Sequence, residues 1–343
     1  MIRTAAVTVR ARRTFAVSLA SAKRVAIGLL AFGMPLAWSS AAMTQGTTGK
    51  PPITFVVTYP AGGGADTMAR LMADAMSETL GQTIVVENKP GGSGRVAAAA
   101  FAKAAPDGNT VLVDASSFAI IPAQYPKLNY DPKSFRVVGI PALFPHVLVV
   151  TPDFEAASAQ DLVARAKAAP GKINFASSGT GSAQHLAGAL FMMRTGTDMN
   201  HIPYRGGAPA LNDVMGGHVK VFFANVASGL PFMQAGKLRP LAISGERRLP
   251  ALPGVSTLAE LGIAGAELYE WNGFFLPPGT PDDVVKRLAD ALDRAKKNPA
   301  VRDRIAALGG EIFAGGQAEA SRFVAAETER MISVVKAANL GPE

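Results

Sequence analysis

The sequence predicts an α/β fold in which mostly parallel sheets are flanked by helices. Two observations carry this prediction: short β-branched runs alternate with amphipathic helical patterns, and three glycine-rich loops each join a strand to a helix. The composition agrees, because 48% hydrophobic with 17% charged residues is typical of packed globular proteins. A chain of 343 residues is long enough for two domains of ordinary size.

The first 42 residues have the composition of an export signal. They carry six basic residues and no acid, and they contain the apolar run VAIGLLAFGMPLAW followed by small residues. A run of about 14 residues is shorter than the roughly 20 needed to cross a bilayer. We therefore expect a cleaved signal peptide over 1–42, a polar linker over 43–51 and a periplasmic protein. The pair Arg12-Arg13 leaves twin-arginine export open beside ordinary secretion.

The rest of the chain is nearly neutral, which excludes a nucleic-acid-binding role. The formal charge is +8, but outside the signal 34 − 6 = 28 basic residues face 26 acidic ones. No basic run with interleaved aromatics remains to bind phosphate backbones. The chain has no cysteine, which excludes disulfides, zinc–thiolate sites and a thiol nucleophile.

Strand and helix patterns follow one another along the chain. Residues 65–80 carry one apolar helical face, made by Met68, Leu71, Met72, Ala75, Met76 and Leu80. In the first series we expect strands at 53–58, 83–87 and 110–114, helices at 65–80 and 94–104, and a strand-like segment at 137–150 broken by Pro141 and Pro145. In the second series we expect helices at 158–168, 183–193, 207–215 and 228–235 and strands at 173–176, 199–203, 219–224 and 238–244. A boundary at PALPG (250–254) precedes three more helices at 282–297, 300–308 and 317–337.

The glycine-rich loops are AGGGAD (61–66), KPGGSGR (89–95) and SSGTGSAQH (177–185). Loops at the carboxyl ends of strands bind ligands, and their free amides favour anions. The loops lack the lysine of a phosphate-binding loop and the third glycine of a dinucleotide site, which argues against nucleotide binding. No serine has a GxSxG setting and the histidines form no HExxH motif, so no hydrolase motif is present. What remains is a cradle in which amides around Gly62–Gly64 hold a small carboxylate, with Asp66 as the N-cap of the next helix. Valine at Gly63 or at Gly64 would then weaken binding.

Several longer motifs resemble one family, from about Pro52 to the C-terminus. They include VVTYPAGGGADTMAR, LGQTIVVENKPGGSGRVAAAAFAKAAPDGNTVLV, INFASSGTGSAQHLAGALF and HIPYRGGAPALNDVMGGHVKVFF. The chain is identified by them as a member of the extracytoplasmic solute receptors of tripartite tricarboxylate transporters, the TctC or Bug family. The resemblance implies a type II periplasmic-binding-protein fold, with lobe 1 over 52–148 plus 250–343, lobe 2 over 149–249, crossover strands and a ligand cleft between the lobes.

The resemblance also implies a set of ligand-binding residues. They lie on the loops that face the cleft: Tyr59, Gly63, Gly64, Asp66, Ser116, Ser117, Ser177, Ser178, Gly181, Ser182, His185, Tyr204, Arg205, Gly206 and Asn225. Three positions depart from the family pattern, namely Ala224 in place of an aspartate, Asp114 in place of a glycine and Ala61 in place of a proline. Loss of the acid at position 224 would suit a more anionic or more apolar ligand than an amino acid.

The expected function is that of a non-enzymatic, monomeric receptor that delivers a small organic carboxylate to membrane permease subunits, without cofactor or metal. Two alternatives stay open at this point. One is a receptor of the same fold that presents its ligand to a membrane sensor kinase. The other is a secreted hydrolase with Ser93 or Ser182 as its nucleophile.

Overall fold

The computed structural model describes residues 49–125, 127–337 and 340. The predicted signal peptide over 1–42 and most of the predicted linker therefore lie outside the described residues. The strands are β1 (Ile53–Val57), β2 (Ile84–Asn88), β3 (Thr110–Ala115), β4 (Arg136–Gly139), β5 (Ala142–Val150), β6 (Asn174–Ser177), β7 (Asn200–Pro203), β8 (Val221–Asn225), β9 (Arg239–Ile243), β10 (Tyr269–Leu276) and β11 (Glu311–Ile312).

The helices alternate with these strands, as the sequence predicts. They are α1 (Gly64–Leu80), α2 (Arg95–Phe101), α3 (Ser117–Gln124), α4 (Ala159–Ala168), α5 (Ala183–Thr195), α6 (Gly207–Met215), α7 (Val226–Gln234), α8 (Asp282–Lys297), α9 (Pro299–Ala307) and α10 (Gln317–Ala337). Short 3₁₀ turns η1 (Gly92–Gly94) and η2 (Pro132–Ser134) complete them.

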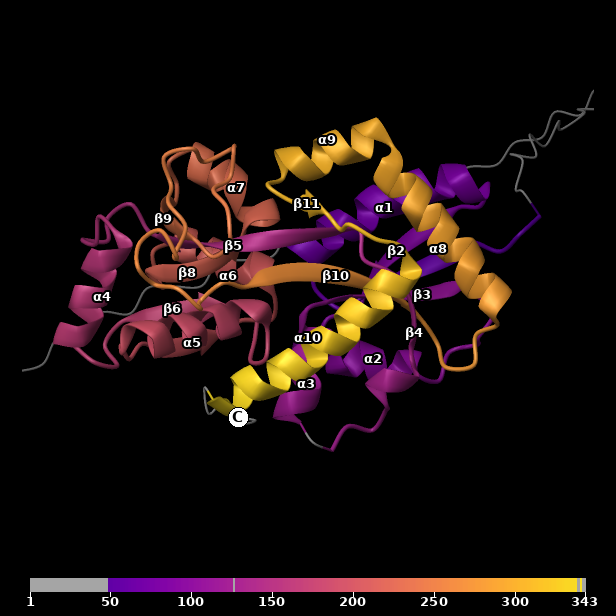
Figure 1. Cartoon of the computed structure of the whole chain (residues 1–343), viewed down its shortest axis with the longest axis horizontal. Helices are drawn as coiled ribbons and strands as arrows, with labels where there is room; N and C mark the ends of the chain where they lie inside the picture. The colour runs from indigo at the N-terminus through magenta and orange to yellow at the C-terminus, as the bar shows by residue number, and fades with distance from the viewer. Residues whose placement is uncertain (1–48, 126, 338–339, 341–343) are drawn as a thin grey trace, which may run out of the picture. The chain divides into compact units, whose positions relative to one another are not determined.

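The sheet is mixed, with parallel strands gathered into two groups. In the first group β1 pairs in parallel with β2 and β3, and in the second β6 pairs in parallel with β7 and β8. The long strands β5 and β10 run antiparallel to their neighbours and join the groups, in the order β2-β1-β3-β10-β5-β8-β6-β7 (Figure 1). The α/β prediction is confirmed, and the antiparallel strands are the connectors between the groups.

The hydrophobic core is split by the sheet into two layers. Alternate residues of β5 show the split: Val147 and Val149 enter one layer, whereas Leu148 and Val150 enter the other. The first layer takes its helical residues from α1, α6, α7, α8 and α9, and the second from α2, α3, α4, α5 and α10. Each layer extends across both groups of strands, so the groups share their cores.

The apolar face of α1 is close to the predicted one but rotated. Met68, Met72 and Met76 are buried, as expected. Ala69 and Ala73 are also buried, because their small side chains let the helix approach the core closely. Leu71, Ala75 and Leu80, by contrast, lie at the edge of the core. The helix ends at Gly81, whose φ of 58° closes the last turn in the left-handed conformation that favours glycine.

The structure differs from the predicted elements most clearly at Pro145, at helix α2 and at helix α3. Pro145 does not break a strand but lies within β5. Before this residue β5 pairs with β10, and after it β5 pairs with β8 and β9. The missing N–H of Pro145 is tolerated because it lies where the pairing partners change. Helix α2 starts one residue later and ends three residues earlier than predicted. Helix α3 escaped prediction because its sequence SFAIIPAQ is buried on nearly every side and contains Pro122, so it shows no helical period.

Candidate functional site

The ends of four loops enclose a cavity of about 610 Å³. Four segments line it: residues 58–60 after β1, residues 90–95 of the second glycine-rich loop, residues 178–180 after β6 and residues 203–205 at the end of β7. Tyr125 completes the wall. The first two loops belong to one group of strands and the last two to the other. The cavity therefore lies between the two parallel groups, at the carboxyl ends of their strands, where ligands of α/β proteins bind.

The walls of this cavity carry positive charge. Among the residues that line it, Arg95 and Arg205 are the charged ones, and no acidic side chain is present. Seven hydroxyl-bearing residues add hydrogen-bonding capacity: Thr58, Tyr59, Ser93, Tyr125, Ser178, Thr180 and Tyr204. Guanidinium groups with hydroxyl groups in a concave site suit a small carboxylate. Four residues of the predicted set line this cavity, namely Tyr59, Ser178, Tyr204 and Arg205.

Loops from the two groups touch directly beside the cavity. The Oγ of Ser93 donates a hydrogen bond of 2.6 Å to the carbonyl oxygen of Thr180. Ser93 has a φ of 51°, the only positive φ of a non-glycine residue in the described part of the chain. A Cβ on Gly179 would lie 2.8 Å from the Ser93 Oγ, so glycine is required there. This bond links the second and third glycine-rich loops across the cavity.

Asp66 is buried and its carboxylate is held internally. It accepts hydrogen bonds from the Gly62 amide at 3.0 Å, from Arg70 Nε at 3.1 Å and from Asn88 Nδ2 at 3.0 Å. Burial alone would raise the pKa of Asp66, but the hydrogen bond from Arg70, then those from Gly62 and Asn88, lower it below the usual value. The predicted N-cap role is wrong, because Gly63 is the N-cap of α1 and Asp66 lies inside the first turn and bonds back to Gly62.

Glycines of both groups also contact the opposite group. A Cβ on Gly64 would lie 2.9 Å from the side chain of Asn225, and a Cβ on Gly206 would lie 2.5 Å from Pro60. Asn225 is the N-cap of α7, since its Oδ1 accepts the Ala227 amide at 2.8 Å. The Asn225 Nδ2 is buried without a hydrogen-bond partner among the described residues. Gly64, Gly206 and Asn225 thus form the contact between the groups and leave one amide donor free.

The loop after β6 is shaped by hydrogen bonds within itself and to α5. The Ser178 amide donates to Gln184 at 2.8 Å, the Gly181 amide donates to His185 Nδ1 at 3.3 Å, and the Oγ of Ser182 accepts the His185 amide at 3.3 Å. These bonds fix the loop so that Ser178 faces the cavity while Ser182 and His185 remain buried.

Two histidine rings stack beneath this loop. The rings of His185 and His201 lie 3.7 Å apart at 8°. Burial, with the His201 ring as the second cause, lowers the pKa of His185 to about 3, so His185 is neutral at physiological pH. His201 Nε2 lies 2.6 Å from the Oγ of Ser177, but Ser177 is completely buried and out of reach of a substrate.

The residues after β7 place one ring and one charge at the cavity. The Tyr204 hydroxyl donates to the Asp213 carboxylate of α6, and burial followed by this bond raises the pKa of Tyr204 to about 12. Arg205 is exposed on the cavity wall. Tyr204 is therefore a fixed wall, whereas Arg205 can reorient toward an anion.

Asp114 is a buried carboxylate behind Tyr59. Its Oδ1 accepts from Thr58 Oγ1 at 2.7 Å, from the Ala115 amide at 2.8 Å and from Ser117 Oγ at 3.2 Å. The Tyr59 hydroxyl interacts with Ser117, and also with Ser93 of the cavity wall. The predicted residue Ser116 lies beside this group with a buried Oγ that has no partner among the described residues. Ser116 and Ser117 therefore support the wall rather than line it.

Burial raises the pKa of Asp114 to about 6, against the hydrogen bonds from Thr58, Ala115 and Ser117, and the charge of Glu270 adds to the rise. The folded protein thus keeps a proton that the unfolded chain releases between about pH 4 and 6, and stability falls as the pH rises through this window. The parent should lose about 2 kcal/mol of unfolding free energy between pH 4 and pH 7 that the Asp114→Asn variant does not lose. Urea unfolding at both pH values tests this, and a pH-independent difference would contradict it.

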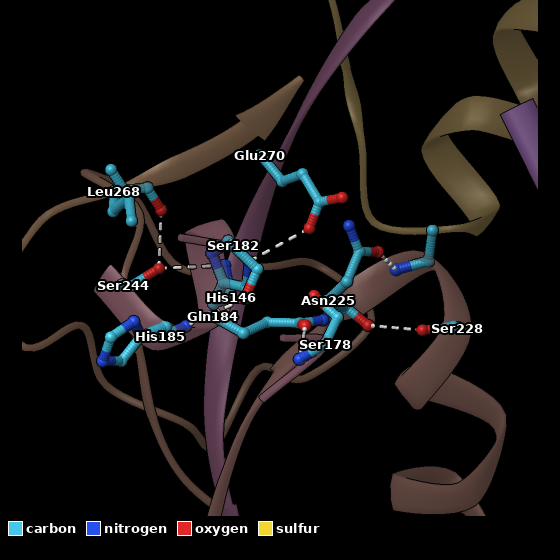
Figure 2. Close-up of polar contacts among 11 residues, drawn as sticks. His146, Ser178, Ser182, Gln184, His185, Asn225, Ser228, Ser244, Leu268 and Glu270 are labelled. Atoms are coloured by element: carbon cyan, nitrogen blue, oxygen red, sulfur yellow. Dashed lines mark hydrogen bonds and ion pairs between the residues drawn. The ribbon is translucent and has the colours of Figure 1, made fainter. Parts of the chain in front are cut away.

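The connecting strands carry a buried contact between a histidine and a glutamate. His146 Nε2 of β5 lies 3.2 Å from Glu270 Oε2 of β10, and the His146 amide donates to Ser244 Oγ at 2.9 Å. Figure 2 shows the Glu270 carboxylate pointing toward His146 and the Asn225 carboxamide. This pair lies where the three strands β5, β8 and β10 meet, because His146 is opposite Asn225 in the sheet register.

Residues 68–340 match the family model described as the tripartite tricarboxylate transporter family receptor, TctC. The chain belongs to the TctC receptor family. A relative from Pseudomonas sp. (strain P51), the UPF0065 protein in the tcbD-tcbE intergenic region, is 37% identical over 81% of this chain and 84% of its own.

Solved TctC-like structures have the same fold. An R. palustris protein solved with adipate has a TM-score of 0.82 and 33% identity, covering 85% of this chain and 98% of its own. MatC from Rhodopseudomonas palustris with bound malate has a TM-score of 0.79 and 31% identity, covering 83% of this chain and 98% of its own. The periplasmic-binding-protein fold that the sequence resemblance implies is confirmed.

Some residues of this TctC receptor's cavity escaped the sequence analysis. Arg95 and Tyr125 line it, and Ser93 closes it, although Ser93 had been considered only as a nucleophile. The signal was present, because Ser93 and Arg95 belong to the glycine-rich loop KPGGSGR. Tyr125 gave no signal, since its place depends on helix α3. The described residues hold no cluster of three or more metal-ligating side chains and no helix that is both long and apolar enough to span a membrane.

Proposed function

We propose that this TctC receptor captures a small organic carboxylate outside the cytoplasm and delivers it to the permease subunits of a tripartite tricarboxylate transporter. The observation that carries the proposal is the cavity between the two strand groups, whose charged wall residues are both arginines. An anion that enters it gains charge-assisted hydrogen bonds without facing a wall carboxylate.

The relatives support a carboxylate over other anions. Adipate is present in the R. palustris structure and malate in MatC, and both are small dicarboxylates. The division into lobe 1 (52–148 plus 250–343) and lobe 2 (149–249) is part of the proposal, with the cavity between the lobes. So are export by the signal over 1–42, the monomeric state and the absence of catalysis. No feature of the described residues favours presentation to a sensor kinase over delivery to a permease.

The ligand class is tested by calorimetric titration of the purified protein with malate and adipate, with their uncharged diamides as controls. The dicarboxylates should bind and raise the unfolding midpoint, whereas the diamides should do neither. Equal binding of acids and diamides would contradict the proposed role of the positive wall.

Arg205→Ala should weaken binding of the best dicarboxylate by about tenfold, equivalent to about 1.4 kcal/mol. The loss is moderate because Arg205 is exposed and its ion pair is partly screened by water. Arg247→Ala is the control, since Arg247 is also exposed but does not line the cavity. An equal loss in both variants would indicate a general effect of net charge, not a contact.

A further inference from the structure

A second, larger cavity of about 760 Å³ lies against α3 and α10. Figure 1 shows these two helices side by side, and they are in contact. The cavity contains none of the residues that the sequence analysis assigned to ligand binding. Its apolar wall residues come from α3, from α10, from β4 and from the segment between α3 and β4, and include Phe118, Leu128, Tyr130, Phe135, Val137 and Val324.

The charges around this second cavity cancel. Asp131 and Glu329 are matched by Lys133 and Arg136. Arg136 is already engaged, since its guanidinium donates to the Thr280 carbonyl at 2.8 Å and pairs with Asp282. The second cavity therefore has no net charge, in contrast to the positive first cavity, and its apolar wall residues lie beside polar ones, namely Ser134, Gln317, Ser321 and Thr328. Such a space suits the hydrocarbon part of a ligand rather than a second anionic group.

Tyr125 is a wall of both cavities. The guanidinium carbon of Arg95 lies 3.6 Å from the centroid of the Tyr125 ring, so the ring and the charge are stacked. Arg95 itself lines the first cavity and is held by a bond of 3.2 Å from its Nε to the Gly92 carbonyl. A carboxylate paired with Arg95 is thus placed beside Tyr125, a side chain that lines both spaces.

We propose that the second cavity receives the apolar body of an extended alkyl or aryl monocarboxylate whose carboxylate pairs with Arg95 in the first cavity. The ligand passes Tyr125, which contacts its first methylene groups. This inference rests on the proposed function and narrows its substrate class. The acidic and basic wall residues of the second cavity cancel, so it offers no net positive charge to compensate the lost solvation of a second carboxylate.

The test is a calorimetric series of butyrate, hexanoate, octanoate and 4-phenylbutyrate, with malate and adipate as references for the proposed function. Affinity should rise from butyrate to octanoate by about threefold per methylene group, which is below the limit for complete burial of each CH₂. Constant affinity along the series, with malate or adipate bound, would overturn this inference and leave the proposed function intact. No binding of any acid would overturn both.

A matched pair of variants locates the effect. Ala325 is exposed on α10 and lines the second cavity, whereas its neighbour Ala326 is exposed and does not. Ala325→Phe should fill the cavity, abolish the gain with chain length and leave butyrate binding unchanged, while Ala326→Phe should behave like the parent. If the affinity of Ala325→Phe still rose with chain length as in the parent, or if neither variant showed this rise, the hydrocarbon chain would lie elsewhere and the inference would be overturned.

Discussion

Replacing Gly181 with alanine should weaken carboxylate binding more than tenfold and lower the unfolding midpoint. Two independent effects add up at this position. Gly181 has a φ of 79°, a conformation that costs an alanine about 1 kcal/mol. In addition, a new Cβ would overlap Oε1 of Gln124 and lie 3.0 Å from Cδ1 of Ile121.

Gln124 cannot move away easily. It is buried at the end of α3, so a displaced carboxamide would press against its packed neighbours. The residue after it, Tyr125, forms a wall of the cavity, so a displaced Gln124 also disturbs the site. The clash lies between a loop of one strand group and a helix of the other, and it should therefore reduce binding more than backbone strain alone.

The control is Gly196→Ala at the other end of the same helix. Gly196 also has a left-handed φ, 61°, but no atom lies within 4 Å of the position of its Cβ. Gly196→Ala should thus report the backbone strain alone and leave binding within twofold of the parent. Adding Gln124→Ala to Gly181→Ala should restore part of the affinity in a double-mutant cycle. Equal losses in Gly181→Ala and Gly196→Ala would show that the Gln124 contact contributes nothing.

Most of the fold was predictable because its elements carry local signals. The methionines of α1 repeat with the helical period, and β-branched runs mark β1 and β3. The failures occurred where tertiary packing replaces such signals. Helix α3 is buried on nearly every side, and Pro145 is tolerated only because the partners of β5 change at that residue. No local pattern contains either fact.

The candidate site was predictable as loops but not as individual contacts. The second and third glycine-rich loops meet at the cavity, where Ser93 bonds Thr180, whereas none of residues 61–66 of the first loop lines it. Which member of each loop faces the cavity depends on loop conformation: Ser178 lines it, whereas Ser177, one residue earlier, is turned inward to His201. The two arginines also show the limit: the resemblance assigns Arg205 to the site, whereas for Arg95 the sequence marks its loop KPGGSGR but not which member of that loop lines the cavity.

Replacing Gly64 with serine should weaken carboxylate binding about tenfold, whereas Gly63→Ser should leave it nearly unchanged. The sequence assigned both glycines the same role, but the structure separates them. Gly63 is the N-cap of α1 with an ordinary φ of −83°, and its Cβ would lie 3.6 Å from the Pro60 carbonyl, an ordinary contact. Serine is moreover a favoured N-cap residue, so Gly63→Ser should preserve or slightly raise stability.

At Gly64 the new Cβ would lie 2.9 Å from three atoms of the Asn225 side chain. Asn225 is buried and caps α7, so moving it costs about 1 kcal/mol of capping energy and separates the first loop from the opposite strand group. Because Tyr59 and Pro60 of that loop line the cavity, the shift should reach the ligand. Calorimetry and thermal unfolding of both variants measure the two effects. A loss in Gly63→Ser as large as that in Gly64→Ser would instead place the ligand directly on the amides of both glycines, and the Asn225 contact would not be the cause.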